Sequence, residues 1–398
     1  MIEPYGGKLV ERILPKDDFK SHVLEPKTKK IVLRHSEQIH LINIATGCYS
    51  PLKGFMTKEE YRTVLTESCL PSGLNWTIPI ILTINKKESS SFRIGDSVIL
   101  VDTKKKPIGI LSVNSVFQVE CCNDAMYLFG TRDKRHPGVK HFCDNCSVGI
   151  GGNVYLAEEA IPSLRYYQTP SAIRTHIMNS EFKTITAFST RNICHIGHEY
   201  LHHIAFELTD ALGINVITGA QIKGKFLPDV VFDTYEYLID KYYPKNRVFM
   251  INFRIPPLYG GPREAFHQAL MLQNMGFSHF IVGRDHAGIG DYYDKYESQE
   301  IFEELTDLDI HILAFSEPRY CKICGKVTTE RSCKHKGNQV EKLNGRDARS
   351  LLLEKDFNEL AYIMRNDLLK YITRTIDRNI KVDGHKVTKN EIRKILFY

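Results

Sequence analysis

Short apolar runs alternate with stretches of helical spacing through the middle of the chain. Thr184–Phe188 is apolar and rich in β-branched residues, which predicts a buried strand. His195–Leu208 has apolar residues at helical spacing and Glu199 in its first turn, which predicts a helix. The polar turn Ser189–Asn192 follows the strand. We expect an anion site here, because free N–H groups and the helix dipole would both point at the bound group.

Two histidines lie at the start of the predicted helix. His195 and His198 are three positions apart, so they share one helix face and can reach the same phosphate chain. Gly197 between them would leave room for a nucleotide close to the backbone. Together with Arg191, the pair indicates nucleotidyl transfer. The alternative is structural, since H-x-x-H occurs by chance and many buried histidines only pair with backbone carbonyls.

The alternation of strands and helices extends from about 166 to 318 and predicts a parallel α/β sheet. Ligands of open parallel sheets bind beyond the carboxyl ends of the strands. Polar clusters follow the predicted strands at Ser189–His198, Lys223, Arg263 and Gly283–Gly288. A glycine-bounded polar turn is common by itself, so Arg284-Asp285-His286 gains weight from the histidine pair in the same predicted sheet.

The two ends of the chain follow other patterns. Short β-type runs bounded by turn residues, such as Lys30–Leu33, Thr77–Thr83 and Asp96–Val101, predict an N-terminal β-rich, barrel-like domain at 1–165. The central α/β nucleotide-binding catalytic domain, Rossmann-like, would cover 166–318. A C-terminal domain at 319–398 would contain a metal-binding segment followed by basic amphipathic helices.

Cys321, Cys324, Cys333 and His335 form a C-x₂-C pair followed by a C-x-H pair. This set predicts a tetrahedral zinc site of structural kind, because four protein ligands leave no open position for chemistry. The alternative is a loop without metal. A separate C-x-x-C, Cys143 to Cys146, has no second pair nearby and is interpreted as two reduced thiols.

Composition narrows the class of protein. The chain has 398 residues, 42% of them hydrophobic and 25% charged, which is ordinary for a soluble globular protein. The net charge of +6 comes without a long basic run, which favours a small anionic substrate and gives no support for nucleic acid. The chain shows neither a run of membrane-span length nor a signal peptide, and its ten cysteines are expected to be reduced. We therefore expect a cytoplasmic protein without a membrane partner.

Several segments together resemble the ATP sulfurylases (sulfate adenylyltransferases). The resemblance covers nearly the whole chain, and the block Phe280–Gly288 is highly specific. The matching segments are Ala45–Met56, His136–Val139, Thr190–Asn192 with His195-x-x-His198-Glu199, Gly261–Ala265 and Gly283–Gly288. The cysteine cluster resembles the zinc-carrying branch. The sequence contains no Gly-x-x-x-x-Gly-Lys-Ser/Thr loop of a fused adenylylsulfate kinase.

The resemblance implies that MgATP and sulfate react reversibly to give adenylyl sulfate and pyrophosphate, by direct in-line attack on the α-phosphate in a homodimer. A side chain need not deprotonate sulfate, so catalysis would consist of aligning two anions and neutralising charge. The implied ATP-binding residues are Ser189, Thr190, Arg191, Asn192, His195, His198, Gly283, Arg284, Asp285 and His286. Sulfate would contact Ser189, Arg191 and the backbone N–H of Ala287, and the catalytic residues would be Thr190, Arg191 and Asn192.

This sequence departs from the family pattern at several positions. Ser189 stands where the family has glutamine, and its shorter side chain reaches less far toward sulfate. The other departures are Ile193 for proline, Ile196 between the histidines, Leu272 for arginine, and Asn344–Arg349, which keeps only the glycine and the last arginine of its motif. Because of these departures, the identity of the acceptor is predicted less firmly than the binding of the nucleotide.

Three other functions therefore stay open. One is a divergent paralogue that adenylylates another oxyanion. A second is a different nucleotidyltransferase or a class I aminoacyl-tRNA synthetase, although the synthetase's Lys-Met-Ser-Lys-Ser-like loop is missing. The third is a nucleotide-binding, non-catalytic subunit, which would have no reason to retain Arg191, both histidines and the Arg284-Asp285-His286 triplet.

Overall fold

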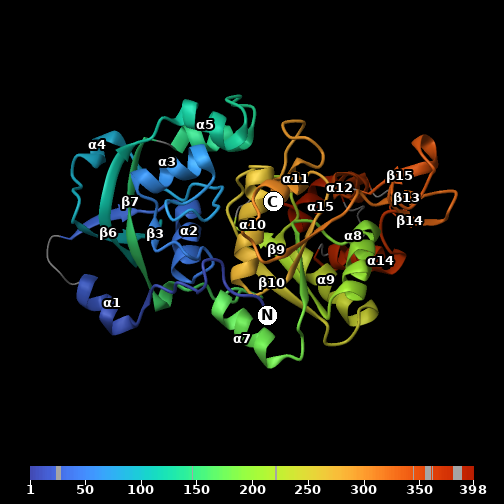
Figure 1. The fold of residues 1–398 in the computed structure, drawn as a ribbon. Coiled ribbons are helices and arrows are strands. Elements are labelled where there is room, and N and C mark those ends of the chain that lie inside the picture. The colour runs from blue at the N-terminus through green and yellow to red at the C-terminus, as the bar shows by residue number, and fades with distance from the viewer. Residues whose placement is uncertain are drawn as a thin grey trace. The chain divides into compact units, whose positions relative to one another are not determined.

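In the computed structural model the chain divides into two compact units (Figure 1). Unit 1 comprises Met1–Phe182 and Arg254–Ala314, and unit 2 comprises Lys183–Phe253 and Phe315–Tyr398. The structure describes residues 1–23, 28–145, 147–219, 222–343, 345–354, 360, 362–379 and 388–398. Among these residues, no helix is long and apolar enough to cross a membrane.

Unit 1 contains a mixed sheet around two long antiparallel strands. Its strand order is β1 (Ile13–Leu14), β7 (Val148–Ala157), β6 (Pro107–Gln118), β5 (Ser97–Val101) and β2 (Lys29–Val32), with β3 (Gly54–Phe55) and β4 (Leu82–Ile84) also paired to β7. The predicted β-rich character is confirmed, but barrel closure is wrong. Among the described strands, β1 and β2 lie at opposite ends of this order and do not pair with each other. They have only two and four residues, which leaves few backbone groups for closing a barrel.

One close approach inside this sheet requires glycine. β3 pairs antiparallel with β7, with Gly54 opposite Asn153 and Phe55 opposite Gly152. A Cβ on Gly54 would lie 1.8 Å from the carbonyl oxygen of Gly152, so no larger residue fits without moving a strand.

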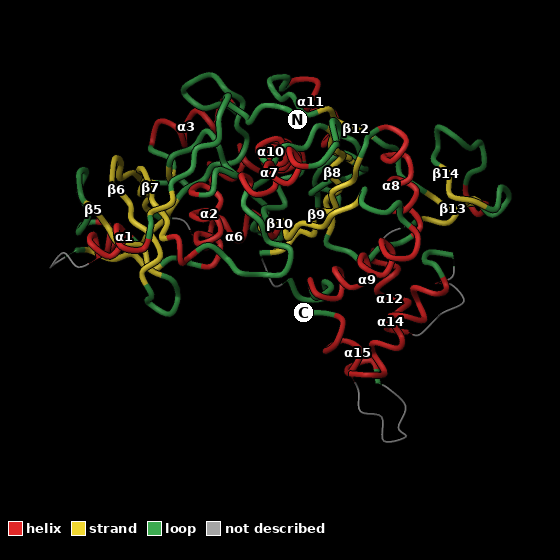
Figure 2. Tube along the Cα trace, turned by 90° about the horizontal axis from the view of Figure 1, so that it is seen from below, coloured by secondary structure: helices red, strands yellow, loops and turns green. Residues whose placement is uncertain are grey.

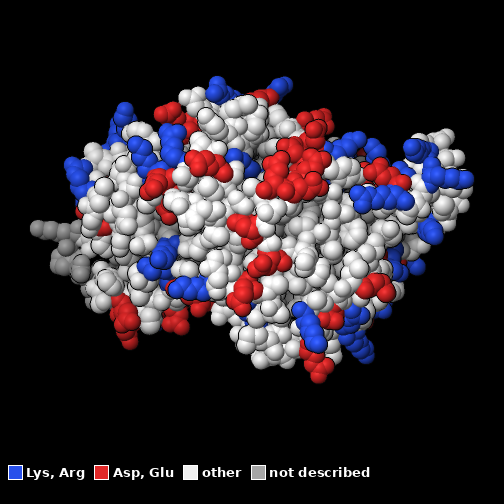
Figure 3. Space-filling view, viewed as in Figure 1, with Lys and Arg blue, Asp and Glu red and all other residues white. Residues whose placement is uncertain are grey.

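Unit 1 also contains several helices. They are α1 (Lys16–Val23), α2 (His35–Ala45), α3 (Lys58–Glu67), α4 (Lys86–Ser89), α5 (Cys121–Phe129), α6 (Pro137–Asn145), α7 (Pro170–Asn179), α10 (Pro262–Asn274) and α11 (Glu297–Glu304), with a 3₁₀ turn at Glu158–Ala160. Helix α10 is buried over nearly its whole length, and the parallel pair β11 (His279–Val282) and β12 (His311–Ala314) follows it in this unit. Helices α2 and α3 contact the sheet around β6 and β7, whereas α10 and α11 pack against each other and against β11 and β12. In Figure 3, acidic side chains gather where α11 carries Glu297 and Glu300 in its first turn.

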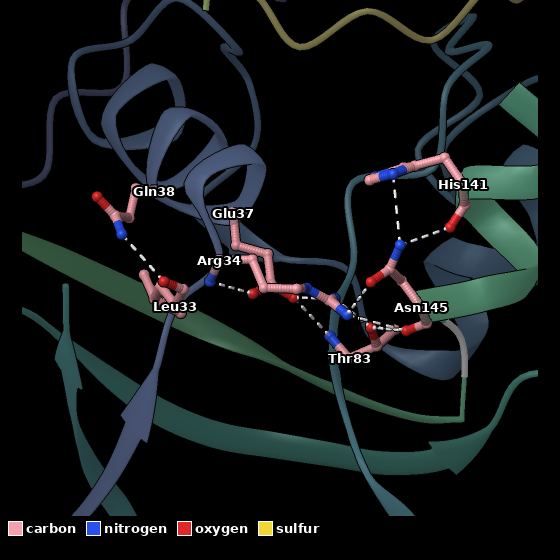
Figure 4. Close-up of polar contacts among 7 residues, drawn as sticks. All are labelled: Leu33, Arg34, Glu37, Gln38, Thr83, His141 and Asn145. Carbon is pink, nitrogen blue, oxygen red and sulfur yellow. Dashed lines mark hydrogen bonds and ion pairs between the residues drawn. The ribbon is translucent and has the colours of Figure 1, made fainter. Parts of the chain in front are cut away.

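A polar network holds the start of α2 in place (Figure 4). Arg34 pairs with Glu37 and donates to Thr83 Oγ1 at 2.6 Å and to both oxygens of Asn145 at 3.1 Å. Asn145 in turn donates to the backbone oxygen of His141 at 2.7 Å. The network thus ties together α2, the β4 segment and the end of α6, and each polar group obtains a partner as its burial demands.

The cysteines of α5 and α6 correct one expectation. Cys143 is a free thiol, as predicted, but Cys121 is disulfide-bonded. Helices α5 and α6 pack together, which places Cys143 Sγ 3.9 Å from the backbone oxygen of Cys121. Spacing within one segment could not reveal such a cross-helix arrangement, and Cys146 lies outside the described residues.

Unit 2 contains the strand–turn–helix that the sequence predicts. Strand β8 (Ile185–Thr190) pairs in parallel with β9 (Ala211–Thr218), and β10 (Val248–Arg254) lies beyond β9. Helix α8 (Ile196–Leu208) follows β8, and α9 (Pro228–Tyr242) follows β9. The predicted strand and helix are confirmed, with β8 extending two residues further, to Thr190.

The C-terminal part of unit 2 is a small sheet followed by helices. Strand β13 (Arg319–Cys321) pairs antiparallel with β14 (Lys326–Thr328) and β15 (Val340–Lys342), with a 3₁₀ turn at Gly337–Gln339. Helices α12 (Gly345–Glu354), α14 (Asn366–Asn379) and α15 (Lys389–Leu396) gather beside α9 in Figure 2. The rings of Tyr237 and Tyr371 stack at 4.6 Å, which fixes α14 on α9.

Candidate active site and metal centre

The turn after β8 is shaped by its own side chains. Thr190, the last residue of β8, is buried, and its Oγ1 accepts a hydrogen bond from the N–H of Asn192 at 3.1 Å. Arg349 of α12 donates from Nη1 to Asn192 Oδ1 at 2.9 Å. This contact holds the amide of Asn192 in one orientation. The sequence had not indicated this contact.

Two side chains of the turn retain hydrogen-bonding capacity. Arg191 is half-buried, and its guanidinium makes no hydrogen bond or ion pair within the part of the chain that the structure describes. Ser189 Oγ is buried and likewise has no partner among the described residues. A buried hydroxyl without a partner is costly, so Ser189 has a reason to bind water or a ligand oxygen.

His195 is the N-cap of α8 rather than a residue inside the helix. Its Nδ1 accepts from the N–H of His198 at 3.3 Å, and the N–H of Ile196 donates to the carbonyl of Ile363 at 2.9 Å. The expectation that free N–H groups of this helix point at a ligand is thus wrong for these two. The free backbone N–H groups at a helix N-terminus bond to any acceptor that packs against them. The sequence does not reveal which residue supplies that acceptor.

Packing within unit 2 requires a glycine at position 197. A Cβ at this position would lie 3.0 Å from Nδ1 of His195 and 3.3 Å from Cβ of Leu343. The missing side chain therefore makes room for the capping histidine and for packing within unit 2. It is a packing glycine.

Burial makes His195 and His198 neutral. The rings of His195 and His198 stack at 3.7 Å. Burial lowers the pKa of His195 to about 4, and burial together with the neighbouring histidines holds the pKa of His198 well below its usual range. At pH 7 both are uncharged. Because Nδ1 of His195 accepts a hydrogen bond, its proton lies on Nε2, which can donate to an anion.

Glu199 forms an ion pair that the sequence did not suggest. The residue is buried in the first turn of α8, and Arg365 donates from Nε to its Oε2 at 2.6 Å. Arg365 also lies over the ring of Tyr242 at 4.2 Å. A buried carboxylate needs such a partner, and here it fixes α8 against the segment that begins α14.

The second group of predicted residues lies in unit 1, in the loop after β11. Asp285 and Ala287 both have left-handed backbone, with φ of 52° and 58°, and they enclose His286 between them. The N–H of Asp285 donates to the carbonyl of Lys295 at 2.8 Å, and His286 Nε2 lies 3.0 Å from Gln268 Oε1. Two left-handed residues so close together are uncommon in a loop, and such conformations cluster at functional sites. Gly283, Arg284, Asp285, His286 and Ala287 thus form one structural group in unit 1, and Ser189–His198 forms another in unit 2.

Arg263 does not belong to a binding cluster as the sequence suggested. Its guanidinium donates to the backbone oxygens of Val64, Leu65 and Thr77 at 3.1 to 3.2 Å. Those carbonyls need donors in the interior of unit 1. The role of Arg263 in the described structure is to join α10 to the end of α3.

The four predicted metal ligands converge. Their donor atoms all lie within 4.8 Å of one another. Cys333 Sγ lies 3.6 Å from Cys321 Sγ and 3.7 Å from Cys324 Sγ, and Nδ1 of His335 lies 3.3 to 3.5 Å from all three sulfur atoms. Thiolates bound tetrahedrally at about 2.3 Å would be roughly 3.8 Å apart, which fits this set.

The surroundings of these ligands are also suited to a metal. The N–H of Cys324 donates to Cys321 Sγ at 3.3 Å, and the turn closes at Gly325, which has a left-handed φ of 65°. Arg319 donates to the carbonyls of Cys333 and His335, both at 3.1 Å. Hydrogen bonds of this kind orient metal ligands. The group could therefore hold a metal ion.

Comparisons with known proteins agree with this architecture. The model of the ATP-sulfurylase family matches residues 164–375, and the model of a PUA-like domain matches residues 2–159. A sulfate adenylyltransferase of Pyrococcus abyssi is 36% identical over 372 residues, which cover 93% of this chain and 97% of that protein. The chain belongs to the ATP-sulfurylase family. It is accordingly a nucleotidyltransferase, and the family predicted from its motifs is confirmed.

Other relatives extend the same finding. The sulfate adenylyltransferase of Hyperthermus butylicus is 37% identical and matches 93% of this chain and 95% of its own length. Among solved structures, a hexameric APS kinase from Thiobacillus denitrificans superposes with a TM-score of 0.69 at 20% identity, covering 94% of this chain and 68% of that one. That likeness concerns the fold alone.

Proposed function

We propose that the chain joins ATP and sulfate to give adenylyl sulfate and pyrophosphate, with the turn after β8 as the reacting centre. The main observation behind this assignment is that the guanidinium of Arg191 is half-buried and forms no hydrogen bond or ion pair with any described residue. Family membership supports the reaction, and the geometry of the turn supports its location.

In the proposed mechanism, a sulfate oxygen attacks the α-phosphorus in line, and the bond from phosphorus to the bridging β-oxygen breaks. Thr190, Arg191 and Asn192 would be the catalytic residues. Arg191 would hold sulfate and the developing negative charge, while Thr190 and Asn192 contact the α-phosphate region. Asn192 is already oriented by Arg349. Alignment and charge stabilisation of this kind need no covalent intermediate.

The histidines would act on the leaving group. His195 and His198 are neutral before substrate binds, so each offers an N–H without repelling its stacked neighbour. An anion nearby favours the protonated form of a histidine. Pyrophosphate would therefore be stabilised by donors that gain charge as it leaves.

The remaining assignments belong to the same proposal. Gly283, Arg284, Asp285 and His286 would bind the adenosine part of ATP, and the N–H of Ala287 would contact sulfate. Mg²⁺ bound to the phosphates would supply further charge neutralisation. Zinc would occupy the Cys321, Cys324, Cys333 and His335 site, since its ligand preference matches that donor set.

Assembly and location complete the proposal. We expect a homodimer, on the strength of the family resemblance. We propose a cytoplasmic location because eight of the described cysteines are free thiols, against a single described cysteine, Cys121, that is disulfide-bonded. We also retain the domain boundaries 1–165, 166–318 and 319–398 as a proposal.

One other function has a specific observation in its favour. Ser189 replaces the family's glutamine, and its Oγ has no partner among the described residues. A site with this spare hydroxyl could accept a different tetrahedral oxyanion. Pyrophosphate release that depends on selenate or phosphate, and is absent with sulfate, would favour that alternative.

Arg191→Ala tests the location of the site. We expect turnover to fall by at least a factor of about 100, since removing one charged donor at a reacting centre costs roughly that much. The melting temperature should be unchanged, because Arg191 lies in a turn and has no described partner. Arg165→Ala, at an exposed arginine of unit 1, is the matched control. Normal turnover in Arg191→Ala would refute the assignment.

A further inference from the structure

The loop after β11 contains a backbone N–H group that has no described acceptor. Ala287 is half-buried, and its N–H donates to no residue that the structure describes. Backbone donors away from water are nearly always paired, so this N–H has capacity for a ligand. The two peptide groups that flank Ala287 set its direction, and each of them accepts a hydrogen bond from outside the loop.

Ser298 holds the peptide group that carries this N–H. The carbonyl of His286 and the N–H of Ala287 belong to one trans peptide plane and point in opposite directions. The hydroxyl of Ser298 donates to that carbonyl at 2.7 Å. Ser298 lies in the first turn of α11 and is only 2% exposed, so solvent does not compete for this bond. The N–H of Ala287 is therefore directed away from Ser298.

Gly261 holds the peptide group on the other side of Ala287. Its N–H donates to the carbonyl of Ala287 at 3.3 Å. Tyr293 fixes the segment around Gly261, since its hydroxyl donates to the carbonyl of Tyr259 at 2.9 Å. Its ring also fills the space beside Gly261, where a Cβ would lie 2.7 Å from it. Tyr259 has a left-handed φ of 57°, which a tyrosine keeps only where its surroundings impose it.

His136 determines the direction in which the Tyr293 hydroxyl donates. The N–H of Val139 donates to Nδ1 of His136 at 3.2 Å, so the proton of the neutral ring lies on Nε2. His136 is fully buried, and burial lowers its pKa, which keeps the ring neutral. Nε2 lies 3.3 Å from the Tyr293 hydroxyl and donates to it. The proton of that hydroxyl is then directed to the carbonyl of Tyr259.

We propose that Ser298 and Tyr293 are positioning residues, which hold the two peptide groups flanking Ala287 so that its N–H meets sulfate in one fixed direction. This inference rests on the proposed contact between sulfate and Ala287. A donor that is already oriented needs no rearrangement when an anion binds. The two residues therefore strengthen the binding of the acceptor rather than that of the nucleotide.

The orientation can be observed in the full-length protein before any substrate is added. We would label alanine with ¹⁵N, identify the Ala287 signal by its loss in Ala287→Gly, and record ¹H–¹⁵N spectra. We expect one sharp Ala287 signal in the wild-type protein and a broadened or split signal in Ser298→Ala and in Tyr293→Phe. A single sharp Ala287 signal in both variants would overturn the proposal.

The neighbouring tyrosine supplies a matched control. The hydroxyl of Tyr292 donates to Asp133 at 3.0 Å, so Tyr292→Phe loses one hydrogen bond of similar length but leaves Tyr259 paired. This variant should keep a single sharp Ala287 signal. Tyr293→Phe removes one oxygen atom only, so it tests the proposal even if Ser298→Ala is unstable.

Kinetics test the consequence for the reaction. In Ser298→Ala and Tyr293→Phe we expect the KM for sulfate to rise roughly tenfold, as the loss of one hydrogen bond would cause, with the KM for ATP and kcat within about twofold. Tyr292→Phe should keep both KM values. A general loss of stability would not separate the two substrates. An unchanged KM for sulfate, or equal increases in both KM values, would contradict the proposal.

A last measurement separates this inference from the function on which it rests. Sulfate added to the wild-type protein together with the unreactive α,β-methylene analogue of MgATP should shift the Ala287 signal. A signal that does not move would show that sulfate does not contact Ala287, and would overturn both the contact and its positioning. A signal that moves in the wild-type protein, while both variants keep the wild-type KM for sulfate, would overturn the positioning alone.

Discussion

At the scale of single residues, the site depends on contacts between segments that are distant in sequence. Asn192 is oriented by Arg349, and Glu199 is paired with Arg365. The chemistry of the turn was predictable from its residue types and its place after a strand. Its supporting partners were not, because they come from segments 157 and 166 residues further along the chain.

Arg349→Met should slow turnover by about tenfold, because a lost hydrogen bond from a charged donor costs on that order. The cause would be a mobile Asn192 amide at the α-phosphate. Arg349→Lys keeps the charge and should remain impaired, since lysine cannot reproduce the planar donor geometry. Initial rates at saturating ATP and sulfate measure the effect. Wild-type rates in both variants would show that Asn192 needs no such support.

At the scale of elements, local pattern predicted β8 and α8 well, because their apolar periodicity is strong and uninterrupted. The open sheet of unit 1 was predicted less well. Closure of a sheet depends on how many residues the end strands offer, and β1 contributes only Ile13 and Leu14. The helix start also differed, since the capping of α8 by His195 is decided by packing around Gly197.

The proposed zinc site at Cys321, Cys324, Cys333 and His335 should stabilise the fold of the segment that carries it. Chelation of zinc should lower the melting temperature, because four-ligand sites contribute binding energy to folding. Cys324→Ser should do the same and should abolish the response to chelator. Cys69→Ser changes a free, half-buried thiol elsewhere and is the matched control. Loss of activity with an unaltered melting curve would instead indicate a catalytic metal.

At the scale of the whole molecule, buried histidines tie stability to pH. Burial lowers the pKa of His40 and His195 to about 4, and that of His202 and His267 to about 3. An unfolded chain would take up protons on these residues near pH 6.5, while the folded protein would not. The free energy of unfolding should therefore fall as pH drops below 6.5, by roughly 1 kcal/mol per histidine at pH 5.5.

His267→Phe isolates one of these groups. The His267 ring lies 4.9 Å from Tyr49 and 5.4 Å from Trp76, and neither of its nitrogens has a partner among the described residues. Phenylalanine keeps the aromatic packing, so we expect an equal or higher melting temperature at pH 7 and a weaker loss at pH 5.5. His176→Gln, at an exposed histidine of α7, is the control. An unchanged pH dependence in His267→Phe would show that burial of this ring does not contribute.

We propose that this chain adenylylates sulfate, a claim that can be tested by measuring pyrophosphate release. Purified protein would be given MgATP with and without sulfate, in the presence of pyrophosphatase to draw the reaction forward. We predict release that depends on sulfate and disappears in Arg191→Ala. Release that is independent of sulfate, or no release although ATP binds, would contradict the claim.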